Sequence, residues 1–201
     1  MPWLPNIFSS SKPVDGNSPT ISAKLDRPEG CEIATLAAGC FWGVEHVFRH
    51  KYEGKGLYDC RVGYSGGAKE NPSYLKVCTG LTGHAEALQI SYDPKKISYH
   101  ELIELFFKMH NPTTLNRQGA DKGSQYRSAI FTHNETQQKQ AEAVKNKMEE
   151  TFYKNPIVTE IEPISSFFDA TEKHQKYLNK NVDGYTCPTH FIRTLPEKQV
   201  A

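Results

Sequence analysis

The chain has almost no net charge, no long apolar run and no leader-like N-terminus, and each absence excludes a class of protein. Its 201 residues include 24 lysines and arginines and 23 aspartates and glutamates, a formal net charge of +1, so it lacks the basic excess of a dedicated nucleic-acid-binding protein. No apolar run approaches the roughly 18 residues that a membrane-spanning helix needs. The N-terminus matches neither a secretory leader nor a mitochondrial presequence. We therefore expect a cytoplasmic protein without nucleic-acid or membrane partners.

Closely spaced cysteines are also absent. The five cysteines are Cys31, Cys40, Cys60, Cys78 and Cys187, and their odd number and wide spacing argue against a disulfide-stapled extracellular scaffold. Because no pair has the Cys-x-x-Cys spacing, a four-cysteine zinc site and a thioredoxin-type dithiol are disfavoured. Nothing positions the eight histidines around a metal, so no metal site is predicted. Free thiols or redox catalysis in an intracellular protein remain as roles for the cysteines.

Length and composition predict one domain with a tail at its N-terminus. Residues 1–30 are rich in serine, proline, asparagine and glycine. That composition cannot bury enough apolar surface to offset the entropy of ordering, so we expect a flexible tail. Residues 31–201 are expected to form a single catalytic domain, whose last segment, from about residue 181, has no helical period.

Hydrophobic periodicity predicts an α+β fold. Strands are expected over residues 32–38, 58–64, 86–92, 128–131 and 157–164, and helices from 40, over 98–110, over 134–153 and from about 170. Ser98 followed by Glu101 matches a capping box, and Asp169 with Glu172 predicts the cap of the last helix. Mixing without strict alternation favours a two-layer sandwich, with helices packed on a mixed or antiparallel sheet and an irregular C-terminal tail.

The densest candidate site is the run Gly39-Cys40-Phe41-Trp42-Gly43. An apolar strand ends before it and a helical period begins at Cys40. A cysteine at a helix start meets unpaired N–H groups and the positive end of the dipole, which favour the thiolate and can lower its pKa. Since two adjacent aromatic residues are more than a cap needs, we interpret Cys40 as reactive. A buried structural cysteine is the alternative.

Two further segments carry polar groups that could serve such a site. Gly83-His84-Ala85-Glu86 enters an apolar strand, where desolvation would keep Glu86 protonated as a general acid. The run from Asp121 to Ser128 offers hydroxyl donors, although a loop and strand edge is the plainer interpretation. A cysteine hydrolase or acyltransferase using Cys40 and His84 stays open at this point, but hydrolases are not expected to place two aromatics directly after the nucleophile.

Together these motifs resemble the methionine sulfoxide reductase A family over roughly residues 33–193. The matching runs, in order, are Gly39–Gly43, Asn71–Tyr74, Gly83–Glu86, Asn116–Gly119 and Asp121–Ser128. The resemblance implies reduction of methionine (S)-S-oxide, free or in proteins, to methionine, and so the repair of oxidised proteins.

The resemblance also implies roles for individual residues. Cys40 is the nucleophile that attacks the sulfoxide sulfur. Phe41 and Trp42 form the pocket for the sulfur-bound methyl group, which packs well on aromatic faces. The groups that bind or protonate the sulfoxide oxygen, or support the nucleophile, are Glu86, Tyr74, Tyr126 and Asp121. Tyr185 and His84 are further candidates for the site.

A second thiol follows from the same resemblance. Oxygen transfer leaves Cys40 as a sulfenic acid, and Cys187, on a mobile C-terminal segment, condenses with it to a disulfide that thioredoxin reduces. Cys60 or Cys78 is the alternative resolving thiol. No cofactor is needed, and the implied partners are thioredoxin and oxidised proteins or free methionine sulfoxide. We expect a monomer.

The chain departs from the family pattern in two places. Many bacterial members carry two cysteines in a glycine-rich C-terminal tail, whereas here Cys187 stands alone before Pro188-Thr189-His190, which is more similar to fungal-type members. Asn111 stands where the family commonly has aspartate, a change that we interpret as structural. A non-enzymatic binder of oxidised methionine peptides is a third hypothesis beside the reductase and the hydrolase.

Overall fold

A computed structural model describes residues 18–194. Its main sheet has six strands in the order β7-β6-β1-β3-β2-β8, and β4 and β5 form a separate ribbon. The strands are β1 (Glu32–Ala38), β2 (Leu57–Ser65), β3 (Ala85–Tyr92), β4 (Arg117–Gln118), β5 (Asp121–Lys122), β6 (Ser128–Thr132), β7 (Glu160–Pro163) and β8 (Phe167–Asp169). The helices are α1 (Phe41–Tyr52), α2 (Tyr74–Cys78), α3 (Tyr99–Met109), α4 (Glu135–Thr151) and α5 (Tyr177–Lys180), with a 3-10 turn at Ser124–Tyr126.

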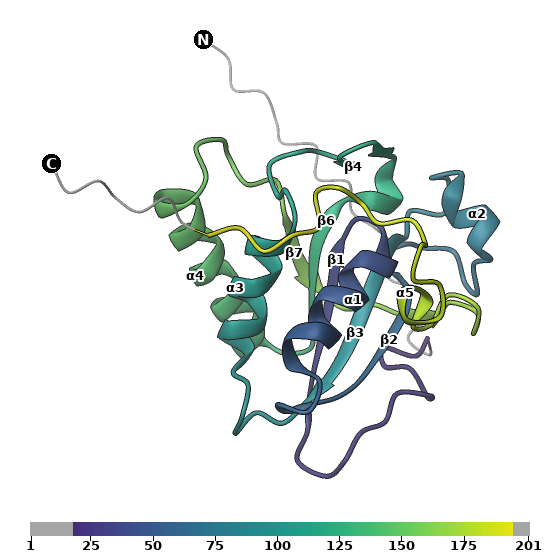
Figure 1. The fold of residues 1–201 in the computed structure, drawn as a ribbon, viewed down its shortest axis with the longest axis horizontal. Coiled ribbons are helices and arrows are strands. Elements are labelled where there is room, and N and C mark those ends of the chain that lie inside the picture. The colour runs from purple at the N-terminus through teal and green to yellow at the C-terminus, as the bar shows by residue number, and fades with distance from the viewer. Residues whose placement is uncertain (1–17, 195–201) are drawn as a thin grey trace, which may run out of the picture.

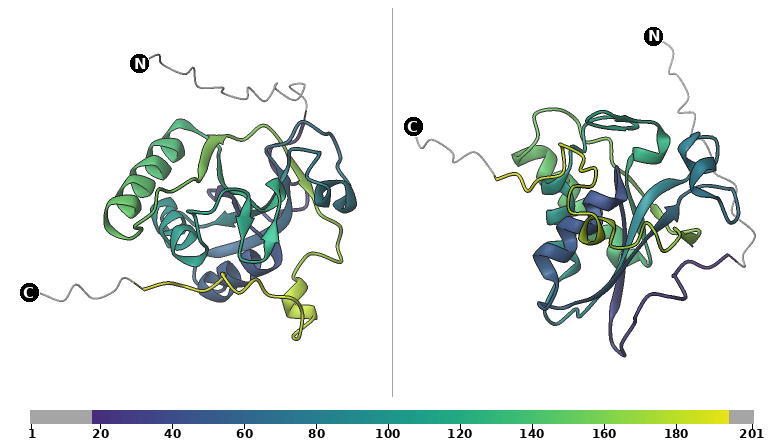
Figure 2. Two further views of the ribbon diagram at one scale, coloured as in Figure 1. Left: turned by 90° about the horizontal axis from the view of Figure 1, so that it is seen from above. Right: turned by 45° about the vertical axis from the view of Figure 1, so that its right-hand side comes forward.

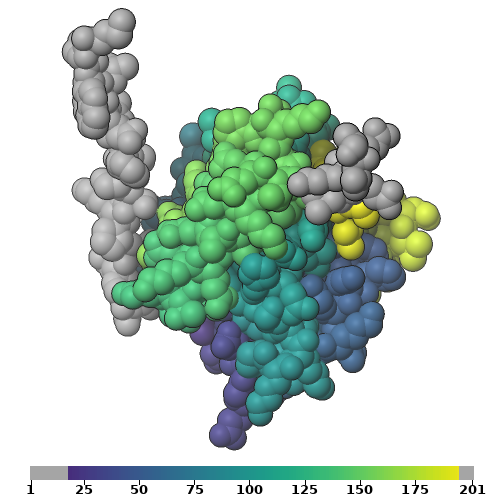
Figure 3. Space-filling model, turned by 90° about the vertical axis from the view of Figure 1, so that its left-hand side faces the viewer, coloured from purple at the N-terminus to yellow at the C-terminus, as the bar shows by residue number. Residues whose placement is uncertain are grey.

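Helices cover one face of this sheet (Figure 1). α1 packs on β1, β2 and β3, while α4 packs on β6 and β7. Figure 3 shows α4, α3 and α1 side by side on the helical side of the molecule. All neighbouring strands are antiparallel except β6 and β7, which run parallel. The predicted α+β class, with helices layered on a mixed sheet, is confirmed.

The central strands are buried on both faces. All eight residues of β3 are buried. Leu36 and Ala38 of β1 belong to the core under the helices, whereas Ala37 belongs to a smaller cluster with Phe131 and Phe167. This alternation follows from the period of two in a strand.

Residues 18–30, which the sequence placed in the N-terminal tail, lie against the domain. The Ser22 N–H donates to Gln89 Oε1 of β3 at 2.8 Å, and its hydroxyl bonds the Asp169 carboxylate of β8. Leu25 is 5% exposed. Residues 1–17 of the predicted tail lie outside the described residues.

The predicted elements differ from the structure most clearly after residue 166. The expected strands up to 164 and the helices up to 153 are present, with end shifts of up to three residues, and the capping box at Ser98 and Glu101 is formed. The expected helix from about Ala170 is wrong, because the Asp169 carboxylate bonds Ser22 and Arg61 instead of capping a helix. Glu172 pairs with Arg61 at 2.7 Å, and the only helix there is α5.

The sequence also missed the short elements α2, β4, β5 and β8. Their lengths of two to five residues are too small for a hydrophobic period to show. The substitution at Asn111 has a local explanation, since its Oδ1 accepts from the Thr113 N–H at 3.1 Å and from the Thr113 hydroxyl at 2.8 Å. The amide oxygen thus serves as the acceptor of this turn.

The helices of residues 18–194 include none with the length and apolar character of a membrane span.

The segment that leads to α5 depends on one buried side chain, and its loss should destabilise the fold. Gln175 Oε1 accepts from the Val62 N–H at 2.9 Å, and Nε2 donates to Val62 O and Ala170 O at 2.8 and 2.9 Å. Gln175→Ala leaves the Val62 N–H without this acceptor, so we expect a loss of about 3 kcal/mol in the free energy of unfolding. Urea unfolding measures it, with Gln140→Ala at an exposed position of α4 as the control; equal midpoints for both variants would contradict the assignment.

Candidate active site

Cys40 occupies the junction between β1 and α1. It is the N-cap of α1, with φ −52° and ψ 113°, and is 6% exposed. Gly39, just before it, has a φ of +91° and lies against the Gln118 side chain, so a side chain at Gly39 would meet both backbone strain and a clash. The backbone N–H groups of Trp42 and Gly43 favour the thiolate of Cys40. The predicted helix start is confirmed.

The expected direction of the Cys40 pKa is wrong. Burial raises the pKa of the Cys40 thiol, and the nearby Glu86 and Asp121 charges raise it further. The N–H groups at the start of α1 act in the predicted direction but are outweighed. Cys40 is therefore a protonated thiol at pH 7.

Glu86 is a buried carboxyl bonded to the start of α1. It is the second residue of β3, is 2% exposed, and its Oε2 accepts from the Phe41 N–H at 3.0 Å. Burial raises the pKa of Glu86 to about 8, and the Asp121 charge acts in the same direction. With Oε2 occupied by an N–H donor, Oε1 is left to carry the proton, and the carboxyl is mainly neutral at pH 7.

Three tyrosines lie close enough to Glu86 for its charge to act on their hydroxyl groups. Burial raises the pKa values of Tyr64, Tyr74 and Tyr126, and the Glu86 charge raises each of them further. All three therefore keep their protons and can donate hydrogen bonds. Tyr74 comes from α2 and Tyr126 from the 3-10 turn, so short elements that the sequence did not show supply these donors.

A cluster of aromatic rings is built on Phe41 and Trp42, the two residues that follow Cys40. Phe41 and Trp42 lie 6.3 Å apart between ring centroids, and both lie within 6 Å of the His174 ring. Tyr177 stacks on Trp42 at 3.8 Å, and Tyr74 lies 4.5 Å from His174. These rings form an aromatic box beside the thiol.

His174 and Tyr177 belong to the box, but the sequence interpretation missed them. The Trp42 Nε1–H donates to His174 Nδ1 at 3.2 Å, which fixes the indole. His174 is 4% exposed, and its Nε2 has no hydrogen-bond partner among residues 18–194. No local signal in the sequence marks them, because a left-handed residue, Lys176, lies between them and only the packing of this segment on Trp42 brings both rings to the box.

A buried ion pair positions α5 for this stacking. Glu45 of α1 bonds Arg49 at 2.9 Å, and its other oxygen accepts from the Lys176 N–H at 2.8 Å. Lys176 has a φ of +52°, a conformation that costs energy for a side chain with a Cβ. The bond to Glu45 holds this residue in place, so that Tyr177 lies on Trp42.

The C-terminal segment brings Tyr185 and Cys187 to the same site. Residues 181–194 form no helix or strand and run across the ends of α1 and α3 (Figures 1 and 2). The Tyr185 hydroxyl bonds both carboxylate oxygens of Asp121 at 2.9 Å. Cys187 is 2% exposed, and its Sγ lies 3.6 Å from Gln118 O. Gln118 also contacts Gly39, so one residue bridges the surroundings of Cys40 and Cys187.

The structure thus gathers most of the predicted site residues but leaves His84 out. Both His84 ring nitrogens are occupied: Nδ1 accepts from the Gly67 N–H at 3.2 Å and Nε2 lies 2.7 Å from Lys69 O. His84 thus holds the glycine-rich loop through both ring nitrogens and is not available as a base for Cys40. The hydrolase hypothesis, which needs His84 in that role, is therefore not supported. Cys78 lies beside Tyr74, whereas Cys60 is 1% exposed in the core.

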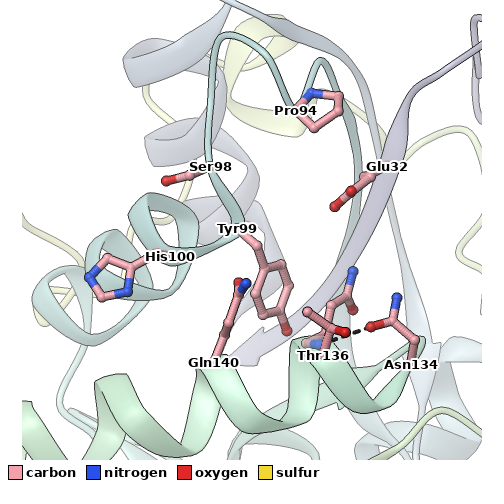
Figure 4. A pocket seen from close by; sticks show the side chains of 9 residues that line it. Glu32, Pro94, Ser98, Tyr99, His100, Asn134, Thr136 and Gln140 are labelled. Atoms are coloured by element: carbon pink, nitrogen blue, oxygen red, sulfur yellow. Dashed lines mark hydrogen bonds between the residues drawn. The ribbon is translucent and has the colours of Figure 1, made fainter.

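A separate cavity of about 380 Å³ lies at the far end of β1 (Figure 4). It is lined by residues from the starts of α3 and α4, among them Tyr99 and Gln140, together with Glu32. Because Glu32 begins β1 and Cys40 follows its end, roughly 20 Å of strand separates the cavity from the thiol. Within residues 18–194, no group of three or more histidine, cysteine, aspartate or glutamate residues is placed to hold a metal ion.

Comparison with known proteins agrees with this geometry. The sequence model of the peptide methionine sulfoxide reductase family matches residues 32–199. The peptide methionine sulfoxide reductase of Saccharomyces cerevisiae is 48% identical over 174 residues, covering 84% of this chain and 94% of the yeast protein.

Solved structures are similar as well. Reduced Mxr1 from Saccharomyces cerevisiae superposes with a TM-score of 0.82 at 46% identity, covering 87% of this chain and 99% of Mxr1. Mxr1 in complex with Trx2 superposes with a TM-score of 0.62 at 34% identity, with the same coverage of 87% and 99%. Since the family model spans most of the chain and the yeast relative is nearly half identical, this chain belongs to the peptide methionine sulfoxide reductase family.

Proposed function

We propose that this protein reduces methionine (S)-S-oxide, free or in oxidised proteins, to methionine, with Cys40 as the nucleophile. One observation carries the proposal: the buried Glu86 carboxyl, whose pKa burial raises to about 8, accepts from the N–H of Phe41, the residue that follows Cys40. Sulfoxide reduction needs a thiol and a proton donor together, because the sulfoxide oxygen must be protonated as its bond to sulfur breaks. Family membership supports the same reaction.

The first step needs no net gain or loss of protons. Cys40 Sγ attacks the sulfoxide sulfur while Glu86 donates its proton to the oxygen. The oxygen then passes to Cys40 as a hydroxyl group, methionine leaves, and the thiol proton of Cys40 returns to Glu86. Thiol and sulfoxide become sulfenic acid and thioether, so atoms and electrons balance.

The aromatic box selects and orients the substrate. A methyl group on sulfur packs well against aromatic faces, and Phe41 and Trp42 provide these faces beside Cys40. With the methyl group there, the sulfoxide oxygen points to the hydroxyl groups of Tyr74 and Tyr126 and to Glu86. This three-point arrangement is how the site would distinguish one sulfoxide epimer from the other.

The enzyme is then restored in two thiol steps. Cys187 condenses with the Cys40 sulfenic acid to form a disulfide and release water, and thioredoxin reduces the disulfide by thiol exchange. The likeness to Mxr1 in complex with Trx2 supports thioredoxin as the partner. We assign residues 31–201 to one catalytic domain. The movement that brings Cys187 to Cys40 is assigned to the segment from about residue 181. We assign the enzyme to the cytoplasm, where thiols stay reduced. Thioredoxin supplies the electrons, and no other cofactor is required.

The proton of Glu86 sets the pH dependence of the first step. A group with a raised pKa of about 8 is protonated below that pH, so the rate of methionine formation in a single turnover should be constant at lower pH and fall above about 8. Glu86→Gln cannot donate the proton, and we expect a reductase step slower by roughly 10²–10⁴-fold without the fall at pH 8. Rapid-quench measurement of methionine gives both rates.

Alkylation of Cys40 by iodoacetamide is the control for that variant. Its rate should stay within a few-fold of wild type, since the thiol is still present. A Glu86→Gln enzyme that forms methionine at the wild-type rate, or a wild-type rate that rises through pH 8, would remove the acid role.

Thiol counts separate the two cysteine roles. Without reductant, the wild type should form one methionine per enzyme and lose two free thiols. Cys187→Ser should form the same single methionine but lose one thiol, and thioredoxin should no longer support turnover, because no disulfide forms. Cys40→Ser should form no methionine.

Cys31→Ser is the matched control and should behave as wild type. If Cys187→Ser still loses two thiols and turns over with thioredoxin, then another cysteine, Cys60 or Cys78, is the resolving thiol. Methionine formation by Cys40→Ser would overturn the assignment of the nucleophile.

A further inference from the structure

Residues Cys187-Pro188-Thr189-His190 form a closed turn that carries Cys187 at one end and a histidine at the other. The His190 N–H donates to Cys187 O at 2.9 Å, and Pro188 occupies the second position, where its fixed φ favours a turn. The Thr189 hydroxyl lies 3.2 Å from Cys187 Sγ and 3.2 Å from Gln118 Oε1. Because the turn is closed by its own bonds, whatever holds His190 also holds Cys187.

His190 is held by the junction that carries Cys40. Its Nε2 lies 2.7 Å from Ala38 O, and since a carbonyl only accepts, Nε2 carries the ring proton. Ala38 ends β1, two residues before Cys40. On the other side of Cys40, the ring lies against Gly43, where an added Cβ would overlap Nδ1. The imidazole therefore bridges the two sides of the nucleophile.

The residues that precede and follow His190 are bonded to other elements: Tyr185, Cys187 and Thr189 to β5 and β4, and the residues after the turn to α3. The Phe191 N–H donates to Met109 O at 3.1 Å and the Arg193 N–H to Lys108 O at 2.9 Å, both at the end of α3. The His190 ring, in contrast, contacts β1 and α1, the two elements on either side of Cys40. Burial lowers the pKa of His190, which keeps the ring neutral and agrees with an Nδ1 that is buried without a partner among the described residues.

We propose that the turn at residues 187–190 is a docking clip, and that His190 is a positioning residue that holds Cys187 within reach of the Cys40 sulfenic acid. The inference rests on the proposed function. In the resolving step, the Cys187 thiol attacks the Cys40 sulfur, the S–S bond forms, the S–O bond breaks, and the hydroxyl leaves with the thiol proton as water. A clip that stays docked limits the search of Cys187 to a local movement and raises its effective concentration at Cys40.

Two substitutions at position 190 test the contribution of the ring and the contribution of its hydrogen bond separately. His190→Phe keeps an aromatic ring but has no donor for Ala38 O. His190→Gln keeps an N–H donor at about the distance of Nε2 from the backbone. After one equivalent of methionine (S)-S-oxide without reductant, we expect the methionine burst of both variants to match wild type. We expect disulfide formation, measured by thiol counting and by dimedone trapping of the sulfenic acid, to be about tenfold slower in His190→Phe and near wild type in His190→Gln.

The outcomes are distinguishable. Disulfide formation at the wild-type rate in His190→Phe, or equal slowing in both variants, overturns the role of the donor. A burst that slows as much as disulfide formation also overturns it, because His190 would then act on the nucleophile and not on the resolving thiol. Failure of the wild type to form methionine would instead overturn the proposed function.

A steric test uses the other contact of the ring and leaves His190 in place. Gly43→Ala adds a methyl group where Nδ1 lies and should slow disulfide formation by displacing the ring. In a His190→Ala background the methyl group has room, so the double variant should be no slower than His190→Ala alone. If the effects of the two single substitutions on disulfide formation multiply in the double variant, Gly43 and His190 are not in direct contact, and the docking clip is contradicted.

Discussion

The hydrogen bond from the Phe41 N–H to Glu86 Oε2, 3.0 Å long, joins the start of α1 to the central strand β3. Because Phe41 directly follows Cys40, it ties the proposed acid to the proposed nucleophile. Neither partner can move without the other, since β3 is buried along its whole length and α1 packs on it. Burial of this pair then determines the chemistry: it keeps the proton on Glu86 at pH 7 and also on Cys40. Glu86 and Cys40 are then both neutral, and Glu86 can protonate a neutral, polar oxygen, as a sulfoxide requires.

The remainder of the site is built around this fixed pair by segments distant in sequence. His174 bonds the Trp42 indole and Tyr177 stacks on it. Glu45 holds their segment against α1 by accepting from the Lys176 N–H. The C-terminal segment lies on the same junction and brings Cys187 into the site. Glu86 and Cys40, with Cys187 held nearby, suit the proposed reaction, in which Cys40 first meets a substrate and then a resolving thiol.

The sequence predicted those parts of the site that depend on local pattern. The strand before Cys40, the helix after it and the apolar strand around Glu86 each show a clear period, and the direction of the Glu86 pKa followed from its place in such a strand. The direction of the Cys40 pKa was wrong, because the helix start is a local property whereas burial depends on what the rest of the chain packs against it. His174 was missed for the same reason, and the helix predicted after Asp169 failed because distant partners use its carboxylate.

The central claim is that Glu86 holds a proton beside Cys40 at neutral pH, and the infrared difference spectrum between wild type and Glu86→Gln tests it most directly. A buried neutral carboxyl gives a C=O stretching band that a carboxylate lacks, and the Glu86→Gln reference assigns that band to one residue. The band should be present at pH 7 and should disappear as the pH rises through about 8. A carboxylate band for Glu86 that persists down to pH 6 would contradict it.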